Sequence, residues 1–152
     1  MSLDLVAVDV DALHRFAFEA FLAMGASEEE ASYCSDGLIQ SELRCLPGQG
    51  QGVRRLPNYH ERITKGWVEL GASFEVIKES QALALVDGHN GLGTVVGRRA
   101  MDLALKKAKE SGIGTVIVRH SSHYGSSAVH ARAAVDQDCI GIAMTNAGPE
   151  MA

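Results

Sequence analysis

The sequence predicts an α/β protein of the α+β type, with helices first and a small sheet after them. Apolar residues with helical spacing, framed by cap residues, occupy most of the first 72 positions, whereas short β-branched runs begin only near residue 74. One of these runs is followed by a long amphipathic segment and then by another run, which is typical of a βαβ unit with parallel strands. We therefore expect an amino-terminal helical segment over residues 1–72 and the first part of a sheet domain over residues 73–152.

Composition and net charge limit the classes of partner and the location that we expect for the protein. The net charge of −5 argues against nucleic acid or an anionic membrane as the main partner. A run of 18 apolar residues is missing and the amino terminus is acidic, so we expect neither a membrane span nor a signal peptide. The three cysteines, Cys34, Cys45 and Cys139, are odd in number and lack the spacing of a metal site, which favours a reduced cytoplasmic location.

Two helices are expected before residue 45. Asp9 or Asp11 can cap the first, and Gly25 ends it. Ser27 and Glu30 form a capping-box pattern that begins the second. The short connection predicts an αα-hairpin.

A loop and a third helix follow. Cys45–Val53 has one proline and three glycines, so we expect a loop there. Val53–Lys65 has helical spacing, and Pro57 fits it only in the first turn.

The second half alternates strands and helices. Phe74–Glu79 and Ala82–Val86 read as strands, and Asp87–Gly91 reads as a turn. Thr94–Ser111 is an amphipathic helix, and Ile113–Val118 is the strand that completes the βαβ unit.

Two further elements are predicted, a helix over Ser127–Asp136 and a strand over Ile140–Met144, giving an unfinished sheet of four strands. Polar residues follow the last two strands, at Arg119–Gly125 and at Thr145–Gly148. Strands that end in polar side chains at the same edge of a sheet are typical of one shared site.

His123 is the first candidate in that site. In a loop its imidazole can remain solvated with a pKa near 6.5, which suits a general acid that protonates a developing alkoxide. The alternative is that the ring only satisfies backbone groups. A metal site formed by His120, His123 and His130 is a weaker hypothesis, because a His-x-x-His pattern in a loop lacks the usual helical spacing and paired carboxylate.

The glycines between Gly88 and Gly97 follow a strand and begin a helix, as in a dinucleotide-binding loop. Their spacing is one residue too long for that motif, and Val118 and Arg119 stand where an acidic residue would be expected. Close helix–sheet packing is the favoured interpretation, and phosphate binding stays open as the alternative.

Arg55 and Tyr59 lie one turn apart in the third helix, with Gln51 just before it. A guanidinium at a helix start interacts poorly with the helix dipole, so a bidentate contact with a carboxylate ligand is a plausible use for Arg55. A solvated surface arginine is the alternative.

Five blocks of sequence together resemble the malate/L-lactate dehydrogenase family of non-Rossmann NAD(P)-dependent oxidoreductases, whose members include ureidoglycolate, sulfolactate and diketogulonate dehydrogenases and reductases of cyclic imino acids. In order, the blocks are SELR (41–44), GVRRLPNY (52–59), ALVDGHNGLG (84–93), VRHSSHYG (118–125) and TNAGPEMA (145–152).

The resemblance implies an amino-terminal helical segment, a mixed and largely antiparallel sheet that binds NAD or NADP, and a homodimer. It implies hydride transfer between the cofactor and C2 of a small 2-hydroxy or 2-oxo acid, or an imine analogue. His123 would exchange the proton and lie beside the cofactor. The substrate would contact Arg55, Tyr59, Ser121 and Ser122, and the pocket would include Thr145 and Asn146.

Two departures from the family pattern keep a second hypothesis open. Gln51 stands where the family has a histidine that is sometimes assigned the acid role, and a glutamine cannot deliver a proton at neutral pH. Members of the family are also considerably longer, so we expect this chain to be the amino-terminal part of such a protein. The alternative is therefore a catalytically silent relative that acts as a dimerising or ligand-binding subunit.

Overall fold

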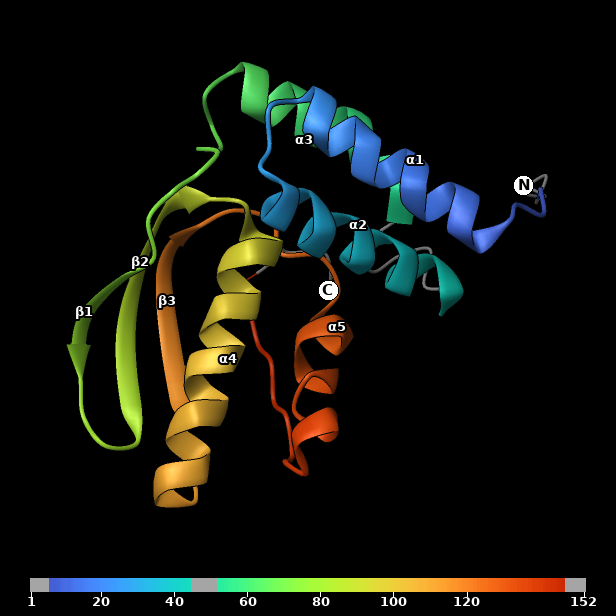
Figure 1. Cartoon of the computed structure of the whole chain (residues 1–152). Coiled ribbons are helices and arrows are strands. Elements are labelled where there is room, and N and C mark those ends of the chain that lie inside the picture. The colour runs from blue at the N-terminus through green and yellow to red at the C-terminus, as the bar shows by residue number, and fades with distance from the viewer. Residues whose placement is uncertain (1–5, 45–51, 147–152) are drawn as a thin grey trace, which may run out of the picture.

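The computed structural model describes residues 6–44 and 52–146 (Figure 1). Its helices and strands follow one another as α1 (Val10–Ala23), α2 (Glu28–Leu43), the 3₁₀ helix η1 (Gly52–Arg55), α3 (Leu56–Thr64), β1 (Glu75–Glu79), β2 (Leu83–Gly91), α4 (Gly93–Ser111), β3 (Thr115–Ser121), α5 (Ser127–Arg132) and the 3₁₀ helix η2 (Val135–Gln137). The helices-first α/β class is confirmed.

The αα-hairpin of α1 and α2 forms for the local reasons that the sequence indicates. The Asp9 carboxylate accepts a hydrogen bond from the Ala12 backbone N–H at 2.9 Å and so begins α1. Ser27 and Glu30 make both bonds of the capping box at the start of α2. The two helices pack against each other, which confirms the predicted hairpin.

The third helix is split in two. Gly52–Arg55 is a 3₁₀ turn, and the α-helix α3 begins only at Leu56, with Pro57 in its first turn. Proline is tolerated there because its missing N–H would have no partner within the helix. The predicted start at Val53 was therefore three residues early for the α-helix.

One apolar cluster joins the helices to the start of α4. Phe21, Cys34, Leu38 and Tyr59 pack with Leu92 and Val95, and all six are buried. The cluster thus takes residues from both sides of position 72. The division into 1–72 and 73–152 stays a prediction.

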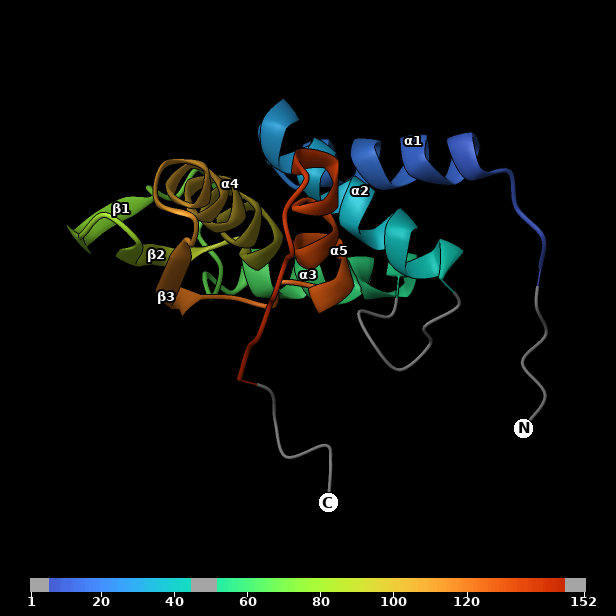
Figure 2. The same ribbon diagram turned by 90° about the horizontal axis from the view of Figure 1, so that it is seen from below.

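The sheet has three strands among the described residues, in the order β1-β2-β3. β1 and β2 are antiparallel, whereas β2 and β3 are parallel and are joined through α4, as predicted for a βαβ unit. The sheet is therefore mixed. Figure 2 shows α4 lying along one face of it, where Ala84 and Val86 of β2 are buried.

Three sequence predictions were wrong in detail. β2 continues through Asp87–Gly91, which we expected to be a turn, because the chain pairs with β3 again after an irregularity. α5 ends at Arg132 instead of continuing to Asp136. Ile140–Met144 forms no strand: Ile140, Ile142 and Met144 are exposed, and within the described residues no neighbouring strand pairs with this segment.

None of the helices in the described part of the chain is both long enough and apolar enough to cross a membrane.

Candidate active site

The site is built where β2 and β3 end beside the helical hairpin. Between Asp87 and Gly91, three residues of β2 lie opposite the single residue His120 of β3. His89, Asn90 and His120 all have positive φ angles, between 46° and 58°, which is uncommon for residues other than glycine. The two strands therefore bend together just before the loop that carries His123.

The buried side chain of Asp87 stabilises this bend. Its side chain is only 6% exposed, and its carboxylate accepts hydrogen bonds from the His89 backbone N–H at 2.9 Å, the His120 Nδ1–H at 2.9 Å and the Arg119 Nε–H at 2.8 Å. The His89 bond, then those from His120 and Arg119, hold the pKa of Asp87 well below its usual range, although burial acts the other way. One carboxylate thus links the irregular part of β2 to the end of β3.

The Ser122 hydroxyl holds the loop after β3 against the end of β2 and the start of α4. Its hydroxyl donates to the Gly91 carbonyl oxygen and accepts from the Gly93 backbone N–H, both at 2.9 Å. A Cβ atom at Gly93 would collide with the backbone carbonyl oxygens of Ser122 and His123. The backbone of the His123 loop therefore lies directly on the start of α4. Close helix–sheet packing is confirmed at Gly88 and Gly91 of β2, where a Cβ atom would lie 3.0 and 3.3 Å from the Val96 side chain of α4.

His123 meets Tyr59 across the boundary between the loop and α3. The Tyr59 hydroxyl lies 3.0 Å from His123 Nδ1, and the two rings meet edge to face with centroids 5.8 Å apart. Tyr59 is 3% exposed and makes a second edge-to-face contact with Phe21, at 5.2 Å. The imidazole is half-buried, and its Nε2 forms no hydrogen bond within the described residues.

Arg55 completes the cluster from the end of η1. Its Nε atom is buried and has no hydrogen-bond partner among the described residues. Its charge contributes to the low pKa of His123, and at Tyr59 it opposes in part the rise in pKa that burial causes. Because a buried donor without a partner costs about 1–3 kcal/mol, an unpaired guanidinium nitrogen favours an acceptor that arrives with a ligand.

The electrostatic setting of His123 differs from the expectation. Burial, followed by the positive charges of Arg55 and Arg62, lowers the pKa of His123 to about 4 from an ordinary value of 6.5. The prediction of a solvated imidazole with a pKa near 6.5 was wrong, because the loop folds back onto α3. At neutral pH the ring is uncharged and can accept a proton.

The other predicted site residues are placed differently. The Ser121 side chain is exposed and donates only weakly, at 3.4 Å, to the Ser122 carbonyl oxygen. Thr145 and Asn146 are exposed, and Thr145 donates to the Asn146 carbonyl oxygen at 3.3 Å. Gln51 lies outside the described residues.

The metal hypothesis finds no support in the described residues, where no three His, Cys, Asp or Glu side chains come together to hold an ion. His120 is bound to Asp87. His130 is buried, donates from Nε2 to the Tyr124 carbonyl oxygen at 2.7 Å and stacks on the Tyr124 ring. The three histidines therefore have separate structural surroundings.

The sequence analysis missed two contacts of the candidate site. Tyr59 was placed beside the substrate, whereas its hydroxyl bonds His123, 64 positions away. Asp87 was assigned to a turn, whereas its buried carboxylate bonds Arg119 and His120. Its place at the end of an apolar run could have indicated this, because a buried carboxylate needs hydrogen-bond or charged partners.

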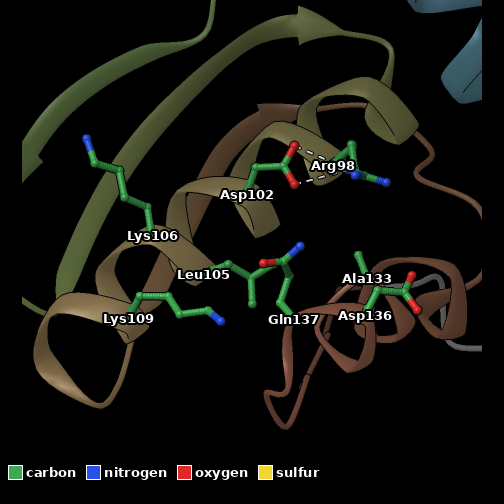
Figure 3. A pocket seen from close by; sticks show the side chains of 8 residues that line it. All are labelled: Arg98, Asp102, Leu105, Lys106, Lys109, Ala133, Asp136 and Gln137. Atoms are coloured by element: carbon green, nitrogen blue, oxygen red, sulfur yellow. Dashed lines mark hydrogen bonds and ion pairs between the residues drawn. The ribbon is translucent and has the colours of Figure 1, made fainter.

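A groove of about 260 Å³ lies apart from this cluster, between α4 and the segment that contains η2. Most of its lining side chains are charged, and Figure 3 shows Arg98 paired with Asp102 on α4. Every predicted site residue lies outside this lining.

Comparison with known proteins identifies the family. The malate/L-lactate dehydrogenase family profile matches residues 8–152. The malate dehydrogenase of Pyrococcus horikoshii is 42% identical over 147 residues, which are 97% of this chain and 40% of that protein. The L-sulfolactate dehydrogenase of Methanocaldococcus jannaschii is 39% identical over 128 residues, which are 84% of this chain and 37% of that protein.

The folds agree as well. The solved P. horikoshii malate dehydrogenase matches with a TM-score of 0.83 and 41% identity, over 87% of this chain and 37% of that one. The chain belongs to the malate/L-lactate dehydrogenase family. It spans about 40% of the length of the first curated relatives, which are malate dehydrogenases. Other relatives are named L-sulfolactate and hydroxycarboxylate dehydrogenases, so the family is one of oxidoreductases of hydroxy acids.

Proposed function

We propose that the protein containing this chain is an NAD(P)-dependent oxidoreductase that moves a hydride between the nicotinamide cofactor and C2 of a small 2-hydroxy or 2-oxo acid. The observation that carries the proposal is the cluster of Arg55, Tyr59 and His123 in a chain of this family. A cation beside a neutral imidazole suits a substrate that carries a carboxylate next to the oxygen that gains or loses a proton.

Arg55 is the proposed carboxylate-binding residue. A carboxylate oxygen would give its buried Nε the acceptor that the described residues do not supply. Guanidinium–carboxylate bonds are charge-assisted and directional, so one such contact also orients C2 of the substrate. Ser121 offers a further exposed hydroxyl to the substrate, whereas the Tyr59 hydroxyl is engaged with His123.

His123 is the proposed acid–base residue. Its neutral ring can take the hydroxyl proton of a 2-hydroxy acid, and the protonated ring can return it to a 2-oxo acid. A bound carboxylate would offset the positive charge of Arg55, which is one of the causes of the low His123 pKa. Binding of the anionic substrate should therefore make the ring easier to protonate when reduction requires it.

One observation fits a nicotinamide and substrate beside His123: its Nε2 forms no hydrogen bond among the described residues and is left for a ligand. When bound, the cofactor, NAD or NADP, would supply or accept the hydride. At the start of α4, the Gly93 N–H already binds Ser122 and is not available to a phosphate. Thr145 and Asn146 remain proposed cofactor contacts.

The test follows NADH and NADPH absorbance at 340 nm with a panel of 2-oxo and imino acids, using the whole product of the gene because the chain spans only part of its relatives. We expect turnover with at least one acid. His123→Gln should lower kcat by about 10²- to 10⁴-fold, the usual contribution of general acid–base catalysis. Arg55→Lys should mainly raise KM, since a lysine cannot form the bidentate contact. Absence of turnover with the whole panel would contradict the proposal.

Gln51 favours a second candidate, a catalytically silent relative that binds ligand or dimerises, because glutamine replaces an ionisable histidine of the resembled family. The two candidates differ in the wild-type protein: an enzyme turns over at least one acid of the panel, whereas a silent subunit turns over none. A rise in turnover in Gln51→His would show that position 51 takes part in proton transfer. The implied homodimer can be checked on the same protein by sedimentation.

A further inference from the structure

We infer that Tyr59 is a positioning residue whose phenol oxygen accepts the Nδ1–H of His123 and so leaves Nε2 as the atom that exchanges a proton with the substrate. The inference deepens the proposed function and rests on it for the direction of the hydrogen bond and for the catalytic consequence. The state of the imidazole can be measured without cofactor or substrate.

Tyr59 is well suited to hold a ring in place. It is 3% exposed, it lies in the apolar cluster with Phe21 and Leu92, and its ring contacts Phe21 edge to face at 5.2 Å. The phenol therefore has one position, and its oxygen lies 3.0 Å from His123 Nδ1. Burial is the main cause that raises the pKa of Tyr59 above its ordinary value, so the hydroxyl keeps its proton at neutral pH.

The His123 loop is fixed just as firmly from its other side. The Ser122 hydroxyl bonds Gly91 and Gly93, and the His123 carbonyl oxygen lies against Gly93. With the loop backbone held by β2 and α4, the Tyr59 contact fixes the remaining freedom, the rotation of the imidazole. Nδ1 then points at the phenol, and Nε2 is the ring nitrogen left for a ligand.

The direction of the hydrogen bond follows from the role proposed for His123. An Nε2 that accepts the substrate proton carries no hydrogen beforehand, so the single hydrogen of the neutral ring stands on Nδ1. The Tyr59 phenol oxygen, 3.0 Å away, then accepts the Nδ1–H of His123. The opposite direction would place the ring proton on Nε2, and a neutral ring in that form cannot accept a proton from a substrate hydroxyl.

The same arrangement serves both protonation states of His123. Nδ1 carries hydrogen in the imidazolium and in the Nδ1–H neutral form, so the bond to Tyr59 persists while Nε2 gains or loses its proton. Proton transfer then needs no rotation of the ring. A tyrosine that only contacted the substrate carboxylate would leave the tautomer unconstrained.

The decisive measurement is the tautomer of His123, read from two-bond ¹H–¹⁵N couplings of the histidine-labelled whole gene product at pH 7. The ring is neutral at this pH because burial lowers its pKa to about 4. We expect the Nδ1–H form in the wild-type chain and a shift towards the Nε2–H form in Tyr59→Phe, which keeps the packing and removes only the hydroxyl. Tyr124→Phe is the matched control, since Tyr124 lies in the same loop but bonds Ser127 at 2.6 Å, and it should leave His123 unchanged.

The wild-type spectrum decides the inference even if Tyr59→Phe does not fold: an Nε2–H ring would overturn it. In the whole gene product, Tyr59→Phe should lower kcat by about 2- to 12-fold with little change in KM, the effect of losing one hydrogen bond in the transition state. A rise in KM with unchanged kcat would instead identify a substrate contact and overturn the positioning role. An Nδ1–H ring in a protein without turnover would remove the proposed function and leave the ring assignment intact.

Discussion

Replacing Ser122 by alanine should destabilise the folded chain far more than replacing its neighbour Ser121. The Ser122 hydroxyl makes two hydrogen bonds of 2.9 Å, to groups of the buried residues Gly91 and Gly93. An intramolecular hydrogen bond contributes about 0.5–1.5 kcal/mol, and a buried group left without a partner costs about 1–3 kcal/mol. For two such groups we expect a loss of about 2–4 kcal/mol in the free energy of unfolding.

Urea or thermal unfolding followed by circular dichroism measures this loss. For a chain of this size, 1 kcal/mol lowers Tm by about 2–4 °C, so Ser122→Ala should lower Tm by roughly 5–15 °C. Ser121→Ala is the control, because the Ser121 hydroxyl is exposed and makes only a 3.4 Å contact, and surface substitutions usually stay within about 0.5 kcal/mol. Equal losses in the two variants would refute the role given to Ser122.

Two further predictions concern the buried and half-buried histidines. Gly97→Ala should destabilise the chain by about 1 kcal/mol, because the new Cβ would lie 2.6 Å from Cε1 of the buried His130 ring. This is the net effect after the similar gain that alanine brings to a helix. Chemical unfolding measures the change, and a stabilised variant would show that the His130 ring can move aside at little cost. Acid should destabilise the chain between pH 6.5 and about 4. Burial and the charges of Arg55 and Arg62 lower the pKa of His123 in the folded state, so in this pH range the His123 imidazole is protonated only in the unfolded state. His123→Gln should lose less stability over the same window, and an identical pH profile would contradict this account.

Sequence patterns predicted well those features that depend on neighbours along the chain. Asp9, Ser27 and Glu30 bond groups three positions away, so the start of α1 and the capping box of α2 could be read from the sequence. The βαβ unit followed from the order of its elements. The strands of the sheet were harder to predict, because a segment forms a strand only where a neighbouring strand can pair with it. Ile140–Met144 has an alternating pattern, but no neighbouring strand pairs with it within the described residues.

By itself, the sequence determined the fold class, most helix ends and the family, because these depend on local pattern or on motifs of a few residues. It also named the candidate site residues. Only the tertiary structure decided which of them lie together. It joined Tyr59 to His123 across 64 positions and Ser122 to Gly93 across 29. It also lowered the pKa of His123, since burial and the nearby charges of Arg55 and Arg62 arise only once α3 and the loop after β3 are packed together.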